Sequence, residues 1–446
     1  MFRLLPGQFI ALVAVLAIMM GTLLLLLPWS TPAHVHLKFL DALFTATSAI
    51  CVTGLIVLDT SKDFTIFGQL IILFLVQIGG LGYATMATLL LLAAGQRIGL
   101  RDRMMLAEAL NVYDMAGLIK LVKIVVIITF TVEGLGAALL TLQFSSDMPL
   151  GQAAYHGTFH AISAFNNAGF STFPDNLIRY RLDWSVNVTV ALLIIGGGLG
   201  FLVYRDLWDN FHAERFRVHT HTKLVLLVSL ILLILGTAMF SIMEWGNPKS
   251  LGGLTAEDRL ISAFFHSVSA RTAGFNTLDM GQIRDDTLYF FILIMVVGGS
   301  PGSTAGGIKT TTLGIVCLSI LNVLRRKEDV VVFHRRIPTQ DVNRAVSLAL
   351  LAMGTITLFT LILASMEPQP FLSLMFEVTS ALATVGYSVG DGGILSLSAI
   401  LSPASKSMII FCMLFGRFGP LLIGLFAIRS SAHILYRHPE ARIAIG

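Results

Sequence analysis

The stretch FHAISAFNNAGF, residues 159–170, contains the pattern that decides the fold: a Phe, a Ser-Ala pair, and then a Gly followed by an apolar or aromatic residue. The four copies of this pattern begin at Phe44, Phe159, Phe265 and Phe376. Their glycines are Gly54, Gly169, Gly274 and Gly386, at spacings of 115, 105 and 112 residues. A pattern that recurs at a nearly constant period predicts repeated copies of one structural unit.

Each copy of the pattern has the same surroundings. A long apolar segment precedes it, at about 9–29, 120–142, 224–243 and 345–364, and a second long segment follows it, at about 66–94, 184–204, 288–324 and 406–428. The short segment that ends at the Ser-Ala pair has about 12 residues, or roughly 18 Å of helix, which is half the depth of a bilayer. Each unit is therefore predicted to be a helix, a re-entrant half-helix (P-loop), an extended loop and a second helix.

The composition places these units in a membrane. Hydrophobic residues make up 55% of the 446 residues and charged residues only 13%, and the mean hydropathy is +0.81. Soluble chains carry about 25% charged residues. We expect an all-α membrane protein with eight transmembrane helices and a single pore-forming domain over 1–446, with repeats at 1–110, 111–222, 223–340 and 341–446. The histidines show no metal-ligand spacing, and we do not expect an enzyme.

The distribution of basic residues predicts the orientation. The side that carries both termini and the loops between repeats has 19 Lys and Arg, whereas the side that carries the half-helices has 9. The positive-inside rule then makes both termini cytoplasmic in a multi-pass protein of the plasma membrane, which is the inner membrane of a bacterium. The outer side has a net negative charge, and a negative vestibule concentrates cations.

The glycine steps are the candidate binding site. Irregular backbone inside a membrane must be buried in protein or line water, so the four turns should meet in a pseudo-fourfold arrangement around one pore. Backbone carbonyl oxygens there can replace the water around a monovalent cation, and the negative ends of four half-helices favour a cation. The expected filter residues are Val52, Thr53 and Gly54; Asn167, Ala168 and Gly169; Thr272, Ala273 and Gly274; and Thr384, Val385 and Gly386. Arg271 is expected to brace the third turn from behind.

The second long segment of the third unit is interrupted. Its residues are Gly298, Gly299, Ser300, Pro301, Gly302, Ser303, Thr304, Ala305, Gly306 and Gly307. Five glycines and a proline carry helix penalties of about 1 and 3 kcal/mol each, so the helix should break. We interpret this segment as an intramembrane gate below the filter, and a packing kink between helices is the alternative.

Two basic residues are assigned to the gate. Arg417 aligns with the glycine-rich stretches 79–82 and 197–200 of the first two units. It is expected to bind carbonyls of the gate loop and to form an electrostatic barrier, with snorkelling to the inner interface as the alternative. Lys309 follows the loop directly, although a place near the cytoplasmic end of the broken helix is also open. Glu133 is expected to make a contact between helices, and a coupling-ion site is the alternative.

The fourfold unit of helix, half-helix, glycine loop and helix resembles the Trk/Ktr/HKT superfamily of K⁺ transporters, over about residues 9–429. With eight helices, the chain looks most like the membrane subunit of the Ktr transporters, the KtrB type. The resemblance implies that the four glycines form a K⁺ selectivity filter. A Ser at the first of these positions is associated with Na⁺ permeation in related transporters, and Gly54 in its place favours K⁺.

The resemblance also implies partners and a mode of action. It implies K⁺ uptake across the plasma membrane by a gated, channel-like homodimer that contacts membrane lipid. A cytosolic ring of RCK-type regulatory subunits would bind the nucleotide, which this chain would not bind itself. K⁺ is the transported ion, no covalent cofactor or nucleic-acid partner is expected, and whether Na⁺ is a co-ion or an activator stays open. The alternative is an alternating-access cation symporter, which the same-side entry of all half-helices disfavours.

Overall fold

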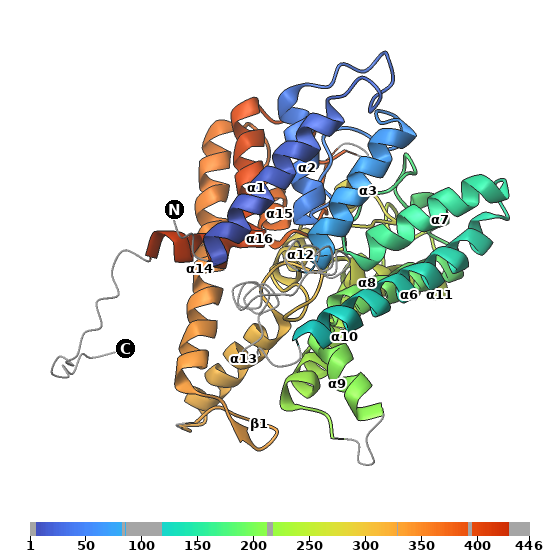
Figure 1. Ribbon diagram of the computed structural model, residues 1–446. Coiled ribbons are helices and arrows are strands. Elements are labelled where there is room, and N and C mark those ends of the chain that lie inside the picture. The colour runs from blue at the N-terminus through green and yellow to red at the C-terminus, as the bar shows by residue number, and fades with distance from the viewer. Residues whose placement is uncertain are drawn as a thin grey trace.

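The computed structural model describes residues 6–82, 85, 118–211, 217–327, 329–390 and 395–427, and in these ranges the chain is almost entirely helical (Figure 1). One small hairpin departs from the all-α prediction. Its strands β1 (Val331–Val332) and β2 (Arg335–Arg336) pair antiparallel, with Val331 opposite Arg336. The predicted repeat boundary at 110–111 and both chain ends lie outside the described residues.

The helix that precedes each half-helix is long and apolar. These helices are α1 (Pro6–Leu25), α6 (Leu118–Phe144), α10 (Thr220–Glu244) and α14 (Thr339–Met366). Among the described residues, α6, α10 and α14 are each long and apolar enough to cross a membrane as one helix. Large apolar side chains such as Leu350 and Leu358 of α14 are exposed on the outside of the protein, as lipid-facing residues would be.

The four half-helices are present where the sequence pattern places them. They are α2 (Phe39–Cys51), α7 (Leu150–Phe165), α11 (Ala256–Ser269) and α15 (Phe371–Ala383), with 13 to 16 residues each. The Phe that begins each copy of the pattern is at most 1% exposed. Each half-helix is therefore anchored by a buried aromatic side chain a few residues before its end.

The helices that follow the turns differ from one another. They are α3 (Ile66–Leu81), α8 (Trp184–Gly198) with α9 (Phe201–Phe211), α12 (Asp285–Met295) with α13 (Thr310–Leu324), and α16 (Pro403–Ala427). Three short 3₁₀ helices lie in the connections, η1 (Ile178–Tyr180), η2 (Met280–Gln282) and η4 (Leu397–Ala399). The predicted break in the third unit is confirmed, since α12 ends before the glycine-rich segment and α13 begins after it.

The prediction of one continuous helix over 184–204 is wrong. The axis turns by 91° between α8 and α9. Gly200, at φ +92°, adopts a backbone conformation that other residues rarely reach, and it lies at this corner after the glycines at 196–198. With two broken spans and the short α3, the number of eight transmembrane helices stays a prediction.

The units pack in a cycle. The helix after each turn contacts the half-helix of the next unit: α3 contacts α7, α8 contacts α11, α12 contacts α15, and α16 contacts α2. The last contact brings the two ends of the fold together, and Figure 1 shows α1 and α2 in blue beside α15 and α16 in orange and red. The four half-helix ends are thereby held around the middle of the molecule.

Candidate functional site

The four turns share two backbone steps with positive φ. In each, the residue two positions before the glycine is left-handed, and the glycine itself has a positive φ. The left-handed residues are Val52, Asn167, Thr272 and Thr384, with φ of 57°, 58°, 77° and 52°, and the glycines Gly54, Gly169, Gly274 and Gly386 have φ of 85°, 69°, 71° and 94°. Side chains at these places differ while the backbone persists, so the turns are equivalent as arrangements of carbonyl groups.

The Ser-Ala pair explains how each half-helix ends in this turn. At the end of α2 the amide of Thr53 donates to the carbonyl of Ser48 at 2.8 Å, and that of Val52 donates to Ala49 at 3.2 Å. These two bonds form the Schellman motif, which requires a left-handed residue after the helix. The same five-residue bond closes the second and fourth turns, from Ala168 to Ser163 and from Val385 to Ser380, both at 2.8 Å. In the third turn, which is one residue shorter, Ala273 and Gly274 both donate to Ser269, at 2.9 and 3.3 Å.

The serine side chain ties the glycine step back to its half-helix. The hydroxyls of Ser48 and Ser380 accept hydrogen bonds from the amides of Gly54 and Gly386, at 3.1 and 3.0 Å. In the other two turns, Ser163 and Ser269 donate to the carbonyls of Phe170 and Phe275, at 2.8 and 2.6 Å. A hydroxyl can both donate and accept a hydrogen bond, which accounts for Ser in every copy of the pattern.

The four glycines form a closed ring. A Cβ added to any of them would lie within 2.6 Å of a backbone oxygen in the next turn. The pairs are Gly54 with Ala168, Gly169 with Ala273, Gly274 with Val385, and Gly386 with Thr53. Each oxygen belongs to the residue just before the next glycine, and the fourth pair returns to the first turn. Four backbone oxygens are thereby gathered at places where only glycine leaves room.

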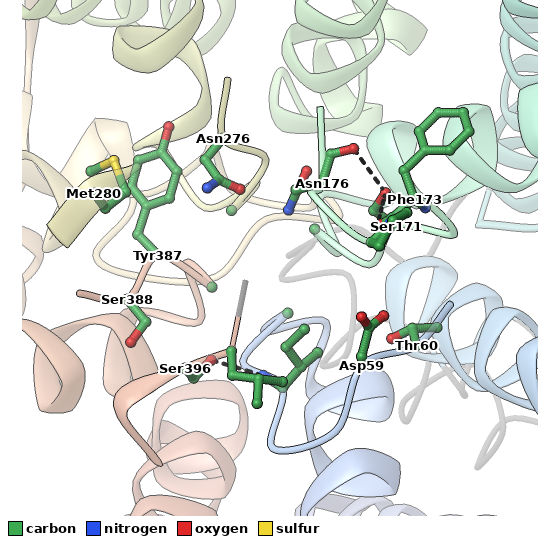
Figure 2. A pocket seen from close by; sticks show the side chains of 17 residues that line it. Asp59, Thr60, Ser171, Phe173, Asn176, Asn276, Met280, Tyr387, Ser388 and Ser396 are labelled. Carbon is green, nitrogen blue, oxygen red and sulfur yellow. Dashed lines mark hydrogen bonds between the residues drawn. The ribbon is translucent and has the colours of Figure 1, made fainter. Parts of the chain in front are cut away.

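A polar pocket opens on one side of the ring (Figure 2). All four glycines line it together with residues that follow them, among which are Asp59, Ser171, Asn276 and Tyr387. Asp59 is the charged residue among those that line the pocket, and its carboxylate lies 3.3 Å from the Lys62 ammonium. The approach to the ring is therefore lined by oxygen-rich side chains and one carboxylate, which suits a cation.

Buried polar side chains brace the walls of this pocket. His160 on α7 contacts the hydroxyl of Ser171 at 2.8 Å, and His266 on α11 contacts the hydroxyl of Tyr387 at 2.9 Å. Glu377 on α15 accepts a hydrogen bond from the Ser388 hydroxyl at 2.5 Å. Each half-helix in these three units thus holds the chain that leaves its own turn or the neighbouring one.

The glycine-rich segment of residues 298–307, from here on the loop, contacts the ring from the other side. Its neck is closed by backbone bonds from Gly298 to Ile308 at 3.0 Å and from Ile308 to Val296 at 2.9 Å. The hydroxyl of Thr304 accepts a hydrogen bond from the side-chain amide of Asn167 at 2.8 Å. It donates one to the backbone carbonyl of Phe165, at the end of α7, at 3.1 Å. Both partners of Thr304 precede the glycine of the second turn in the chain. The pocket, in contrast, is lined by the turn glycines and by residues that follow them.

The loop also docks on the bend between α8 and α9. The amides of Ser300 and Thr304 donate to the carbonyls of Gly198 and Gly197, at 3.0 and 3.2 Å, and the Phe201 amide donates to Gly302 at 2.8 Å. A bent helix leaves such backbone groups unpaired, and buried groups of this kind need partners. Sequence reasoning missed this docking, and the run of three glycines at 196–198 was its only signal.

Three basic side chains bind the carbonyls of the loop. Arg417 donates to Thr304 at 2.7 Å and, with its other nitrogen, to Gly79 of α3 at 2.7 Å. The Lys309 ammonium donates to Ala305 at 2.9 Å, and Arg271 donates to Gly298 at 3.4 Å. Arg271 also reaches the Ser229 hydroxyl on α10, so it lies behind the third turn. Hydrogen bonds from charged donors are the stronger kind, and they hold the loop where it lies.

The aligned glycine stretches have a packing role. A Cβ on Gly79, Gly197 or Gly416 would overlap a carbonyl oxygen in the last turn of the half-helix of the same unit. In the third unit a Cβ on Gly298 would instead overlap the carbonyl of Gly306, within the loop. The loop therefore occupies the place where the other units bring a helix against the half-helix.

The fold and the ring define a class: a helical membrane transport protein with a central ring of backbone oxygens. The family model of TrkH, described as cation transport protein, matches residues 13–434. The chain therefore belongs to this family of cation transport proteins, and it is a transporter and not an enzyme. The resemblance stated from the sequence is confirmed.

Known relatives match over nearly the whole length. The Ktr system potassium uptake protein B of Bacillus subtilis is 39% identical over 100% of this chain and 97% of its own. The protein of the same name from Vibrio alginolyticus is 37% identical over 92% and 89%. The potassium/sodium uptake protein NtpJ of Enterococcus hirae is 35% identical over 100% and 98%.

A solved structure shows the same fold. The crystal structure of the potassium transporter TrkH from Vibrio parahaemolyticus matches with a TM-score of 0.75 and 17% identity, over 96% of this chain and 86% of that chain. At this identity the likeness concerns the fold alone. It agrees with a mostly helical membrane protein.

Proposed function

We propose that this chain takes up K⁺ across the bacterial plasma membrane as a gated, channel-like subunit, and that the ring of turn glycines is its selectivity filter. The observation that carries the proposal is the closed ring, in which each glycine meets the backbone oxygen before the next one. Backbone oxygens in such a ring can replace the hydration shell of K⁺. The names of the relatives, which are potassium uptake proteins, support K⁺ as the cargo.

The four units are proposed to surround one pore with pseudo-fourfold symmetry. The cyclic packing of each helix on the next half-helix supports this arrangement. Eight spans are proposed from the eight long apolar segments of the sequence. Cytoplasmic termini and half-helices that enter from outside follow from the positive-inside rule. The pocket lined by Asp59 is then the outer mouth, and the loop lies on the cytoplasmic side of the filter.

The loop is proposed to be the gate, with Arg417, Lys309 and Arg271 as the groups that hold it closed. It contacts the second turn through Thr304 and the bend of α8 and α9 through backbone bonds. Positive charges bound beside the path oppose a cation until the loop moves away, because like charges repel strongly where water is scarce. A mere packing kink would not need three charged partners.

Two partners are proposed from the family: a second copy of the chain and a cytosolic ring of nucleotide-binding regulatory subunits. The exposed hairpin with Arg335 and Arg336, close in sequence to Arg325, Arg326 and Lys327, offers a basic surface on the proposed inner side. An acidic partner surface would complement it. The NtpJ name includes sodium, so we also propose that Na⁺ influences transport by this chain.

The experiment that tests the function is uptake of ⁸⁶Rb⁺ by liposomes that contain the purified protein. We expect an outward K⁺ gradient to drive ⁸⁶Rb⁺ uptake. External K⁺ should inhibit this uptake, and the same concentration of external Na⁺ should inhibit it little. A change in rate when Na⁺ is added on one side would show its influence. No uptake under any of these conditions, by a protein that elutes as one species, would refute the proposal.

A further inference from the structure

A buried carboxylate lies between three helices behind the second turn. Glu133, on the apolar helix α6, is 4% exposed. Its Oε2 accepts a hydrogen bond from Gln77 Nε2 on α3 at 3.2 Å, and its Oε1 accepts one from Asn166 Nδ2 at 2.9 Å. Asn166 Nδ2 also donates to Gln77 Oε1 at 2.9 Å. The three side chains form a closed triangle of hydrogen bonds.

Asn166 connects this triangle to the turn. It is the first residue after α7, and the next residue, Asn167, is the left-handed one whose amide binds Thr304 of the loop. The Asn166 side chain also packs directly on Gly80, where an added Cβ would overlap the Asn166 side-chain oxygen. The Asn166 side chain is therefore fixed from several directions, and the start of the second turn is fixed with it.

The other turns have no such triangle among the described residues. The residues at the position of Asn166, three before the glycine, are Cys51, Arg271 and Ala383. Cys51 and Ala383 are buried and apolar in character, while Arg271 binds the loop. The second turn is thus held by a carboxylate from a helix outside the ring, an arrangement that the fourfold pattern did not predict.

The donor and acceptor pattern favours an ionised carboxylate at position 133. Both oxygens of Glu133 face an N–H group, and an ionised carboxylate is the side chain that only accepts. An amide in its place would bring a donor against Gln77 Nε2 or Asn166 Nδ2. If Gln77 turned over to accept from it, the Gln77 amide nitrogen would face that of Asn166. Asn166 turns the same side-chain atom toward both residue 77 and residue 133. With an amide at all three positions, one of the three contacts therefore always joins two donors or two acceptors.

We propose that Glu133 is a positioning residue for the second turn, that it acts as an ionised carboxylate through Asn166, and that the ion selectivity of the ring depends on it. This inference rests on the proposed function, since it assigns the ring as the filter. An ionised group at this depth is costly. The hydrogen bonds that the carboxylate accepts from Gln77 and Asn166 offset part of this cost.

The decisive comparison is a swap of the two side chains. In E133Q one contact of the triangle is frustrated, whereas in the double variant E133Q/Q77E the carboxylate moves to position 77. There it accepts from the new amide at position 133 and from Asn166. The oxygen of that new amide accepts from Asn166 in turn, so every contact is satisfied again. The net charge of the triangle is the same in the double variant as in the original protein.

Selectivity is measured as the ratio of K⁺ to Na⁺ permeability in liposomes, together with the half-saturating K⁺ concentration and the maximal rate. We expect E133Q to lower the ratio by about tenfold, the size of one unsatisfied buried contact, and the double variant to restore it to within about twofold of the original. A Thr129→Val control lies one turn earlier on α6, at a buried hydroxyl without a partner in the described residues, and should leave the ratio unchanged.

The outcomes are distinct. If the unaltered protein takes up no ⁸⁶Rb⁺, the proposed function fails. If it does and E133Q keeps the original ratio, the inference alone is overturned. If E133Q does not fold, the double variant still decides: a folded, selective double variant supports the triangle, and a folded, unselective one overturns it.

Discussion

The turns and the helices that follow them show opposite behaviour. The four turns share their left-handed backbone steps although their side chains differ. The helices after them differ in course: α3 is a single helix as far as it is described, α8 and α9 meet at 91°, a loop separates α12 from α13, and α16 carries Arg417. The turn has a similar backbone geometry in all four units, whereas the segment after the turn has a different form in each.

This contrast fits the proposed filter and gate. A dehydrated ion needs oxygens on all sides, and in the proposed filter four similar backbone turns would provide them. The proposed gate needs one moving element and fixed surroundings, and the bent helix, the loop and Arg417 come from three different units. The following substitutions test this division, because changes at the ring should alter selectivity and changes below it should alter flux.

The largest effect is expected from a side chain in the ring. Gly54→Ser places a Cβ within 2.6 Å of the Ala168 oxygen and imposes a positive φ on a residue with a side chain. We expect the ratio of K⁺ to Na⁺ permeability to fall by about tenfold or more. Gly134→Ala, on α6 where a Cβ would have no described residue within 4 Å, is the control. Unchanged ratios for Gly54→Ser would contradict the assignment of the filter.

Shortening the loop should have the next largest effect. Removal of residues 301–303 takes away the bond between Phe201 and Gly302 and leaves the neck at 296 and 308 in place. We expect ⁸⁶Rb⁺ flux to rise by more than about tenfold, with the same K⁺ to Na⁺ ratio, since the ring is untouched. Equal or lower flux in a variant that folds normally would count against a gate.

Arg417→Gln should raise flux by a smaller factor. It removes charge-assisted bonds to Thr304 and Gly79, each of a kind that contributes about 1.5–3 kcal/mol. Lys309 and Arg271 still hold the loop, so we expect a rise of about tenfold or less. Flux in proteoliposomes is the measurement, and a fall in flux with normal folding would mean that Arg417 holds the path open.

Two glycines with similar backbones offer a matched pair. Gly200 and Gly82 have φ of +92° and +77°, but a Cβ on Gly200 would lie 2.6 Å from the Pro301 oxygen, while a Cβ on Gly82 would meet nothing within 4 Å among the residues that the structure describes. We expect Gly200→Ala to raise flux about twofold to fivefold by weakening the docking of the loop. Gly82→Ala has the same kind of strain without the contact and should not raise it. Equal changes in flux in Gly200→Ala and Gly82→Ala would contradict a role of the bend between α8 and α9 in holding the loop.

The smallest effect is expected at the Ser-Ala pairs. Ser48→Ala leaves the Gly54 amide without its acceptor, at a cost of about 1–3 kcal/mol. We expect a lower midpoint of thermal unfolding and little change in flux or selectivity, because the backbone bond from Thr53 to the Ser48 carbonyl remains. A loss of selectivity as large as that of Gly54→Ser would show that the hydroxyl shapes the ring itself.

Much of this architecture could be predicted because its signals are local. A Schellman end needs a left-handed residue after a helix, and a Ser-Ala pair followed by Gly, six residues after the Ser in three copies and five in the third, marks it in the sequence. The break at residues 298–307 is marked in the same way by its glycines and Pro301. The half-helices and the interruption of the third unit were therefore found where they were expected.

The rest depends on contacts between units. The stretch 196–200 is rich in glycine, but the 91° turn between α8 and α9 there depends on the loop of another unit, which pairs with the freed backbone. Nothing within the stretch itself identifies that partner. The same holds for Glu133, since its need for two donors becomes visible only when Gln77 and Asn166 meet it in space.

The most direct test of the ring is anomalous X-ray diffraction from crystals of the protein grown with Rb⁺ in place of K⁺. We expect a Rb⁺ peak enclosed by the carbonyl oxygens of Thr53, Ala168, Ala273 and Val385, which border the ring. Peaks only at side-chain carboxylates elsewhere, with none inside the ring, would contradict it.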